Sequence, residues 1–278
     1  MWCNKEITGV GLGLRSLHLP HILQDFPKIP WFEILIDNYF CDGGLAIKNL
    51  SRIREHYPVA FHSVGMSIAG SDPIDIDWFL QLKNLMKKFE PAWVSDHLCW
   101  TNFGGKYFHD LLPFPMNEES LKHVSERILC VQDILQQEIL LENVSSYISF
   151  STSEYDEADF LCNLHKKTGC YILLDINNVY VSAYNNSFSA EAYLDKIPIE
   201  AVKQFHLAGY EDNGKYLLDS HGAPVWKEVW DLYKKAVQKF GRIPTLIEWD
   251  NNIPDFAVLV SEVKMAEAKR EEALSELG

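Results

Sequence analysis

The sequence predicts a (β/α)8 barrel, and two observations lead to this fold class. Short apolar runs alternate with longer amphipathic stretches about eight times along the chain, as strands and helices do in such a barrel. The sequence contains no tandem repeat, linker or low-complexity segment, so we expect residues 1–278 to form a single TIM-barrel domain. A doubly wound open sheet is the alternative, although the stretch GVGLGLRS lacks the third glycine of a dinucleotide-binding loop.

The individual elements follow from the spacing of apolar residues. Continuous apolar runs fit strands that are buried in the barrel, and they span residues 7–14, 31–36, 58–64, 91–98, 138–144, 171–177, 202–209 and 244–250. Apolar residues at three- and four-residue spacing indicate amphipathic helices, most clearly at residues 77–89, 119–136, 156–169 and 225–241. Gly169 and Gly241 end the last two stretches as helix C-caps do.

Composition and charge restrict the cellular setting and the partners. The chain has 278 residues, 47% of them hydrophobic, but no apolar run is long enough to span a membrane. The N-terminus lacks the features of a signal peptide, and six cysteines are scattered without a CxxC pair, as in reduced cytosolic proteins. We therefore expect a cytoplasmic protein without a membrane partner. The net charge of −14, with no basic run longer than two residues, argues against a nucleic-acid partner.

Polar side chains follow the predicted strands at the end where a barrel carries its active site. The run YILL, for example, is followed at once by Asp175, Asn177 and Asn178, and a carboxylate at the end of a buried strand is costly unless it is paired. The remaining strand ends and the loop after the seventh strand contribute His62, Asp96, His97, Glu142, Asn143, His206, Asp219, His221, Glu248 and Asp250. Any one histidine could be a structural residue, and Asp–Asn pairs often cap the next helix. These structural explanations would have to hold separately at six consecutive strand ends, so we favour a functional role for the residues there.

Electrostatics favours a metal centre at this rim. Glu142, Asp175, Asp219 and Glu248 should converge there, and two carboxylates about 4 Å apart repel by roughly 4 kcal/mol at an effective dielectric constant near 20. Such a cluster requires shifted pKa values or bound cations. Neutral imidazoles are good metal ligands, and a mixture of histidine and carboxylate ligands suits Fe, Mn or Zn. More than four ligands predict more than one ion. Asp175 is predicted to be one of these ligands.

With these residues identified, the sequence resembles a known family. The motifs GVGLGLR, FHSVGMS, VSDHLCW, HDLLPFP, ILLENVSSY, LLDINNVYVSA, FHLAG, DSHGAPVW and PTLIEWD cover nearly the whole chain in order. They resemble those of the multinuclear non-haem iron-dependent oxidases, the family of the methanobactin-biosynthesis enzyme. This family lies within the xylose-isomerase-like superfamily of TIM barrels.

The resemblance implies a ligand set, cofactors and a substrate. One ion would be bound by His62, His97 and Glu142, and a second by Glu142, Asp175, His206 and Glu248. A third would use Asn178, Asp219 and His221, although related apurinic endonucleases carry a histidine in place of Asn178. The implied cofactors are two or three iron ions, with a mixed-valent Fe(II)/Fe(III) pair, and O2 is the implied co-substrate. The implied substrate is a cysteine-containing, ribosomally synthesised peptide, presented by a small partner protein that binds its leader.

Other residues are expected to support this chemistry. Asp96, Asn143, Asn177 and Asp250 are candidates to orient the imidazoles or relay protons. Arg15, Asn38 and Tyr210 are candidates for substrate binding, and an internal salt bridge is the alternative for Arg15. Tyr210 and the DNYF stretch that contains Asn38 are also the two places where the chain departs from the family pattern. A sugar isomerase, an apurinic-endonuclease-like phosphodiesterase and a non-catalytic scaffold are the alternative functions.

Overall fold

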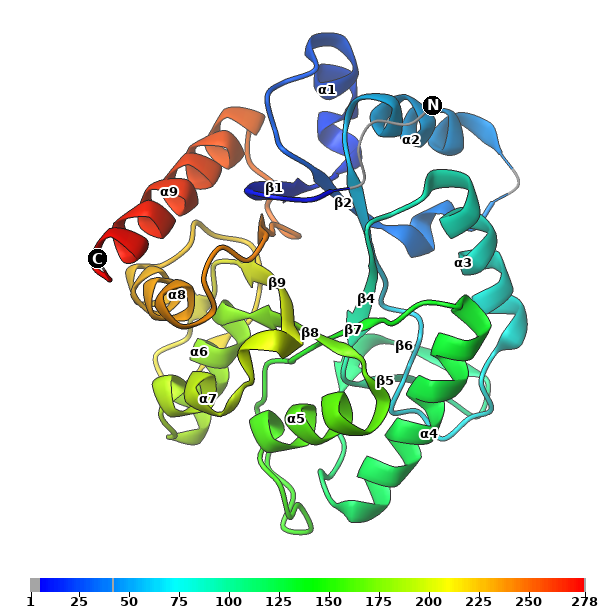
Figure 1. The fold of residues 1–278 in the computed structure, drawn as a ribbon, viewed down its shortest axis with the longest axis vertical. Helices are drawn as coiled ribbons and strands as arrows, with labels where there is room; N and C mark the ends of the chain where they lie inside the picture. The colour runs from blue at the N-terminus through cyan, green and yellow to red at the C-terminus, as the bar shows by residue number, and fades with distance from the viewer. Residues whose placement is uncertain (1–5, 42, 278) are drawn as a thin grey trace.

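The computed structural model describes residues 6–41 and 43–277 and confirms the predicted barrel (Figure 1). Eight parallel strands form a closed sheet in which β1 pairs with both β2 and β12. A doubly wound open sheet is therefore excluded. In order around the barrel the strands are β1 (Val10–Gly13), β2 (Phe32–Leu35), β3 (Val59–His62), β4 (Val94–His97), β7 (Leu140–Glu142), β8 (Tyr171–Asp175), β9 (Val202–Leu207) and β12 (Thr245–Ile247).

Helices surround the barrel, as Figure 1 shows. They are α1 (Leu19–Asp25), α2 (Gly44–His56), α3 (Ile76–Phe89), α4 (Glu118–Leu135), α5 (Glu157–Thr168), α6 (Ile176–Asn186), α7 (Ala190–Lys196), α8 (Lys227–Phe240) and α9 (Phe256–Ser275), with short 3-10 turns η1 (Ser16–His18), η2 (Ile36–Tyr39) and η3 (Ile199–Ala201). The four helices predicted from periodicity are α3, α4, α5 and α8. Gly169 and Gly241 cap α5 and α8 with positive φ angles, as predicted. Among the described residues, none of the helices combines the length and the hydropathy that a membrane span requires.

The sixth strand of the barrel is shorter than the sequence suggests. The predicted strand runs over residues 171–177, but β8 ends at Asp175 and α6 begins at Ile176. Asp175 Oδ1 accepts a hydrogen bond from the backbone N–H of Asn178 at 2.6 Å, which caps the helix and stops the strand. Asn177 and Asn178 therefore lie in the first turn of α6.

Two hairpins in the loops after barrel strands were not predicted. The first joins β5 (Trp100–Phe103) to β6 (Lys106–Leu112) through Gly104 and Gly105, which both have positive φ as a type I′ turn requires. The second joins β10 (Glu211–Asp212) to β11 (Leu217–Leu218) and leads directly into Asp219. Both hairpins extend the end of the barrel at which the predicted site residues lie.

The cysteines form no disulfide among the described residues. Cys41, Cys99, Cys130, Cys162 and Cys170 are free thiols, as expected for reduced cysteines, and Cys3 lies outside the described residues.

Candidate metal centre

A cavity of about 660 Å³ opens at the carboxyl ends of the barrel strands. Six of the predicted ligands line it, namely His62, His97, Asn178, Asp219, His221 and Glu248. The other three, Glu142, Asp175 and His206, are completely buried. The strand register explains why they meet. His97 lies opposite Glu142, and Asp175 lies opposite His206, on neighbouring strands.

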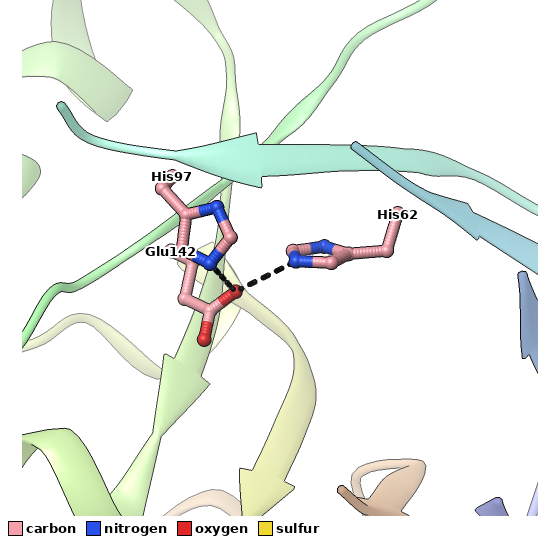
Figure 2. A group of neighbouring side chains, drawn as sticks. All are labelled: His62, His97 and Glu142. Atoms are coloured by element: carbon pink, nitrogen blue, oxygen red, sulfur yellow. Dashed lines mark ion pairs between the residues drawn. The ribbon is translucent and has the colours of Figure 1, made fainter. Parts of the chain in front are cut away.

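The first group consists of His62, His97 and Glu142 (Figure 2). Both histidine rings point at the same carboxylate oxygen, and Glu142 Oε2 lies 3.4 Å from His62 Nε2 and 3.5 Å from His97 Nε2. These separations exceed those of ordinary N–H···O hydrogen bonds, which reach about 3.2 Å. The three side chains thus surround a position at which one cation would contact all of them.

The second group uses the opposite side of the same carboxylate. Glu142 Oε1 lies 3.5 Å from His206 Nδ1, which is also 2.8 Å from Glu248 Oε2. Ligand atoms of Glu142, Asp175, His206 and Glu248 all lie within 4.8 Å of one another. Each oxygen of Glu142 therefore faces a different group, as a carboxylate that bridges two ions must.

Unsatisfied polar atoms show that these residues fit a metal. Both oxygens of Glu142, Asp175 Oδ2 and His206 Nδ1 are buried and have no hydrogen-bond partner among the described residues. A buried polar group without a partner typically costs about 1–3 kcal/mol, and more when it is charged. Four such atoms in adjacent groups are accounted for together if cations bind between them.

Side chains on the far side of two rings hold the imidazoles in place, and for His62 they also set the tautomer that metal binding needs. Ser95 Oγ donates to the carbonyl of Phe61 and lies 2.8 Å from His62 Nδ1, so it accepts the Nδ1 proton and leaves Nε2 free. His206 Nε2 lies 2.7 Å from the amide nitrogen of Gln204 and 3.2 Å from Glu33 Oε2, so these two side chains hold the ring with Nδ1 facing Glu142 and Glu248. Such second partners orient ligating imidazoles and increase their basicity.

Sequence analysis missed both orienting residues, Ser95 and Glu33. Glu33 interrupts the apolar run WFEILI and is almost fully buried. It also accepts a hydrogen bond from Gln204 at 2.6 Å. A lone carboxylate within an apolar strand is the signal that could have identified Glu33. The sequence around Ser95 contains no such signal.

The predicted supporting residues lie next to the predicted ligands. Asp96 Oδ1 is 3.5 Å from His97 Nδ1. The side chain of Asn143 forms two hydrogen bonds with the backbone of Asp175, at 2.8 and 3.0 Å. Asn177 Nδ2 donates to Asp219 Oδ1 at 2.9 Å.

The third predicted group centres on His221, whose two ring nitrogens face different carboxylates. Nε2 is buried, has no hydrogen-bond partner among the described residues, and lies 2.7 Å from Asp219 Oδ1. Nδ1 lies 3.2 Å from Asp250 Oδ2 and 3.4 Å from Glu248 Oε2. His221, Glu248 and Asp250 also form a compact group that could hold an ion.

Asn178 lines the same cavity. Its amide nitrogen donates a hydrogen bond to the carbonyl of Asn143 at 3.1 Å, so Oδ1 points away from that carbonyl. Oδ1 is buried and unpaired within the described chain, so it remains available as a neutral ligand.

The three predicted substrate-binding residues are not brought together. Arg15 lines the cavity, but its side chain is bonded to Asp250 and to the carbonyl of Trp249. Asn38 is exposed in η2 and Tyr210 is buried between the rings of Tyr180 and Trp226. Neither of these two residues lines the cavity with the predicted ligands.

Charge within the site is balanced by protons when no cation is bound. Burial raises the pKa of Asp175 well above its usual value, and the neighbouring Glu142 carboxylate raises it further. Burial alone would lower the pKa of His97, but Glu142 and Asp96 outweigh that effect and raise it to about 9. Burial opposes ionisation of Glu142, yet the adjacent histidines lower its pKa to about 2.

These pKa values predict that metal affinity increases with pH. Because the pKa of His97 is raised, protons compete with a cation for this imidazole up to about pH 9, and one proton must leave on binding. Zn²⁺ affinity for metal-free protein should therefore rise by up to about tenfold per pH unit between roughly pH 6 and 9. Competition titrations with a chromophoric chelator would measure it. An affinity that is constant over this range would contradict the assignment of His97 as a ligand.

Comparison with known proteins places the chain in a family. A family model described as "RiPP precursor modification enzyme MbnB/TglH/ChrH" matches residues 9–271. The chain belongs to this family. RiPP denotes a ribosomally synthesised and post-translationally modified peptide, so the family description is that of peptide-modifying enzymes. The chain is also 48% identical over 261 residues to a UPF0276 protein of Acaryochloris marina, with 94% of each sequence covered.

Solved structures show the same fold in more distant proteins. An L-ribulose 3-epimerase matches with a TM-score of 0.67 and 13% identity, covering 98% of this chain and 97% of its own. Endonuclease IV from Thermus thermophilus matches with a TM-score of 0.61 and 12% identity, covering 95% and 99%. A xylose isomerase-like TIM barrel protein from Mycobacterium smegmatis has a TM-score of 0.61 at 10% identity, with 96% and 98% covered. These likenesses establish the barrel fold and nothing about the reaction.

Proposed function

We propose that this protein is a multinuclear iron-dependent oxidase that uses O2 to modify a cysteine-containing, ribosomally synthesised peptide. The observation that carries the proposal is Glu142, whose two buried oxygens face two different groups of histidines and carboxylates. Two cations bridged by one carboxylate are a common arrangement for redox and hydrolytic chemistry. Membership of a family described as modifying peptide precursors favours a peptide substrate.

Iron bound in these groups would pass electrons from the peptide to O2, so that the peptide is oxidised and O2 is reduced. The protein residues would hold and orient the ions. His62 and His97 would present Nε2 atoms to the first ion, and His206 would present Nδ1 to the second, because Ser95 fixes the tautomer of His62 while Glu33 and Gln204 hold the ring of His206. Buried carboxylates would neutralise the ionic charge, and the cavity would admit a cysteine side chain beside His62 and His97.

A small protein that binds the leader of the precursor would present the peptide at the cavity, and the reaction would occur in the cytoplasm. Co-purification of the chain with proteins encoded near its gene would test whether it binds such a partner.

Metal analysis tests the core of the proposal. Protein expressed with added iron and purified without oxygen should contain about two iron ions per chain, and a third at most. Mössbauer and EPR spectra should show a coupled Fe(II)/Fe(III) pair, and exposure to O2 with the precursor peptide should change the peptide mass. Less than one metal ion per chain would contradict the proposal.

The phosphodiesterase alternative predicts a different outcome. Because phosphate contacts dominate nucleic-acid affinity, a chain with a net charge of −14 should bind DNA poorly even at low salt. We expect negligible cleavage of abasic-site DNA in the presence of Zn²⁺, Mn²⁺ or Fe²⁺. Cleavage at enzyme-like rates that is lost in His97→Ala would instead favour the endonuclease function.

A further inference from the structure

Arg15 lies against the third predicted metal position. Its guanidinium contacts Asp250 Oδ1, its Nη2 is 3.9 Å from Glu248 Oε1, and its Nε donates to the carbonyl of Trp249 at 3.1 Å. The side chain folds back over Gly13, where an added β-carbon would lie only 2.8 Å from Nη1. The guanidinium is thus held in place on several sides.

The same contacts extend from Arg15 to His221. Asp250 receives the guanidinium on Oδ1, and Oδ2 lies 3.2 Å from His221 Nδ1. The other nitrogen, Nε2, faces Asp219 Oδ1 at 2.7 Å. Since an ionised carboxylate only accepts hydrogen bonds, either nitrogen can carry a proton in these contacts, and an ion replaces the proton of the nitrogen that it binds.

Two alternative ion positions therefore exist around one imidazole. An ion at Nε2 would use Asp219, whereas an ion at Nδ1 would use Glu248 and Asp250. A neutral imidazole has one free nitrogen, so it can serve only one of these positions. Arg15 already supplies a permanent positive charge to Glu248 and Asp250, the carboxylates of the position at Nδ1.

We propose that Arg15 is a positioning residue that selects between these two positions: its guanidinium closes the one at Glu248 and Asp250 and leaves the one at His221 Nε2 and Asp219. This inference rests on the metal centre of the proposed function. It assigns Arg15 to the metal site of the protein itself, in place of binding a substrate carboxylate. Without the guanidinium, Asp250 is free to ligate an ion, and His221 can bind that ion through Nδ1.

Zn²⁺ titration of metal-free protein tests this inference independently of iron and O2. In the wild-type background, Asp219→Asn should weaken the third Zn²⁺ by more than about tenfold. In the Arg15→Met background the same substitution should have less than about a threefold effect, and Asp250→Asn should now abolish the third Zn²⁺. Arg15→Lys, which retains the charge, should behave as wild type. Circular dichroism would verify folding, and Arg15→Gln would replace Arg15→Met if the latter does not fold.

The outcomes separate the two proposals. If Asp219→Asn weakens the third ion equally in both backgrounds, or if Arg15→Met binds no third Zn²⁺, Arg15 does not select the position. The Glu142-bridged pair and the oxidase proposal would then still stand. If wild-type protein fails to bind even two Zn²⁺ ions, the metal centre is wrong and both proposals fall.

Discussion

Replacing Glu142 by alanine is expected to remove both ions of the bridged pair and to abolish peptide oxidation. Each oxygen of Glu142 faces a separate group of ligands, so a single substitution removes one ligand from two ions. Loss of a residue that only supports a ligand typically costs 10–100-fold in metal affinity or activity. Loss of the shared ligand itself should lower the affinity for each ion by more than about 100-fold. This effect should be larger than that of any other single change in the site. Elemental analysis of protein purified without oxygen would measure it.

Glu157→Gln provides the matched control for this substitution. Glu157 follows β7 in the chain, and its two oxygens accept hydrogen bonds from the backbone N–H of Val144 at 3.1 Å and the hydroxyl of Tyr193 at 2.9 Å. Burial raises its pKa to about 7, and both of its partners are donors from the protein itself. The glutamine variant should therefore keep its metals. If Glu142→Ala also kept both ions, the bridging assignment would be wrong.

The barrel and the position of the site were predictable because both depend on local sequence patterns. Parallel strands buried on both faces are uniformly apolar, so the runs around His62 and Glu142 stand out from the helices between them. Since a barrel carries its active site where strands end, polar residues at those ends could be grouped without coordinates. The structure brings His62, His97 and Glu142 together for this reason.

Details that depend on contacts between distant segments were not predictable. The far-side partners of His62 and His206 come from other strands of the barrel, and Ser95 has no unusual sequence setting. The start of α6 at Ile176 was missed because a strand-end carboxylate can serve as a ligand or as a cap. One oxygen of Asp175 caps the helix, and the other is unpaired in the described chain. The two interpretations are compatible, because one carboxylate has enough oxygens for both.

The same geometry ranks the ions by how firmly they should be held. Asp175 is fully buried at the end of a paired strand and its backbone is fixed by Asn143. His221 lies in a loop with a left-handed backbone conformation, at a φ of 46°, and is partly exposed. Ligands on strands are positioned more precisely than ligands on loops. The third ion, which also relies on the neutral amide of Asn178, should therefore leave first during dialysis against a mild chelator.

Substitutions at Asp175 and His221 should consequently have very different effects. His221→Ala should remove one metal ion and spare at least part of the peptide oxidation, because the bridged pair remains. Asp175→Ala should abolish oxidation, but it also removes the cap of α6, which is worth about 1 kcal/mol of stability. Asp175→Asn separates the two effects, since the amide oxygen can still accept from Asn178 N–H while the negative charge is lost. The asparagine variant should fold with near-normal stability and still be inactive. If His221→Ala were as inactive as Asp175→Asn while keeping two ions, the third position would take part in the reaction and this division of roles would be wrong.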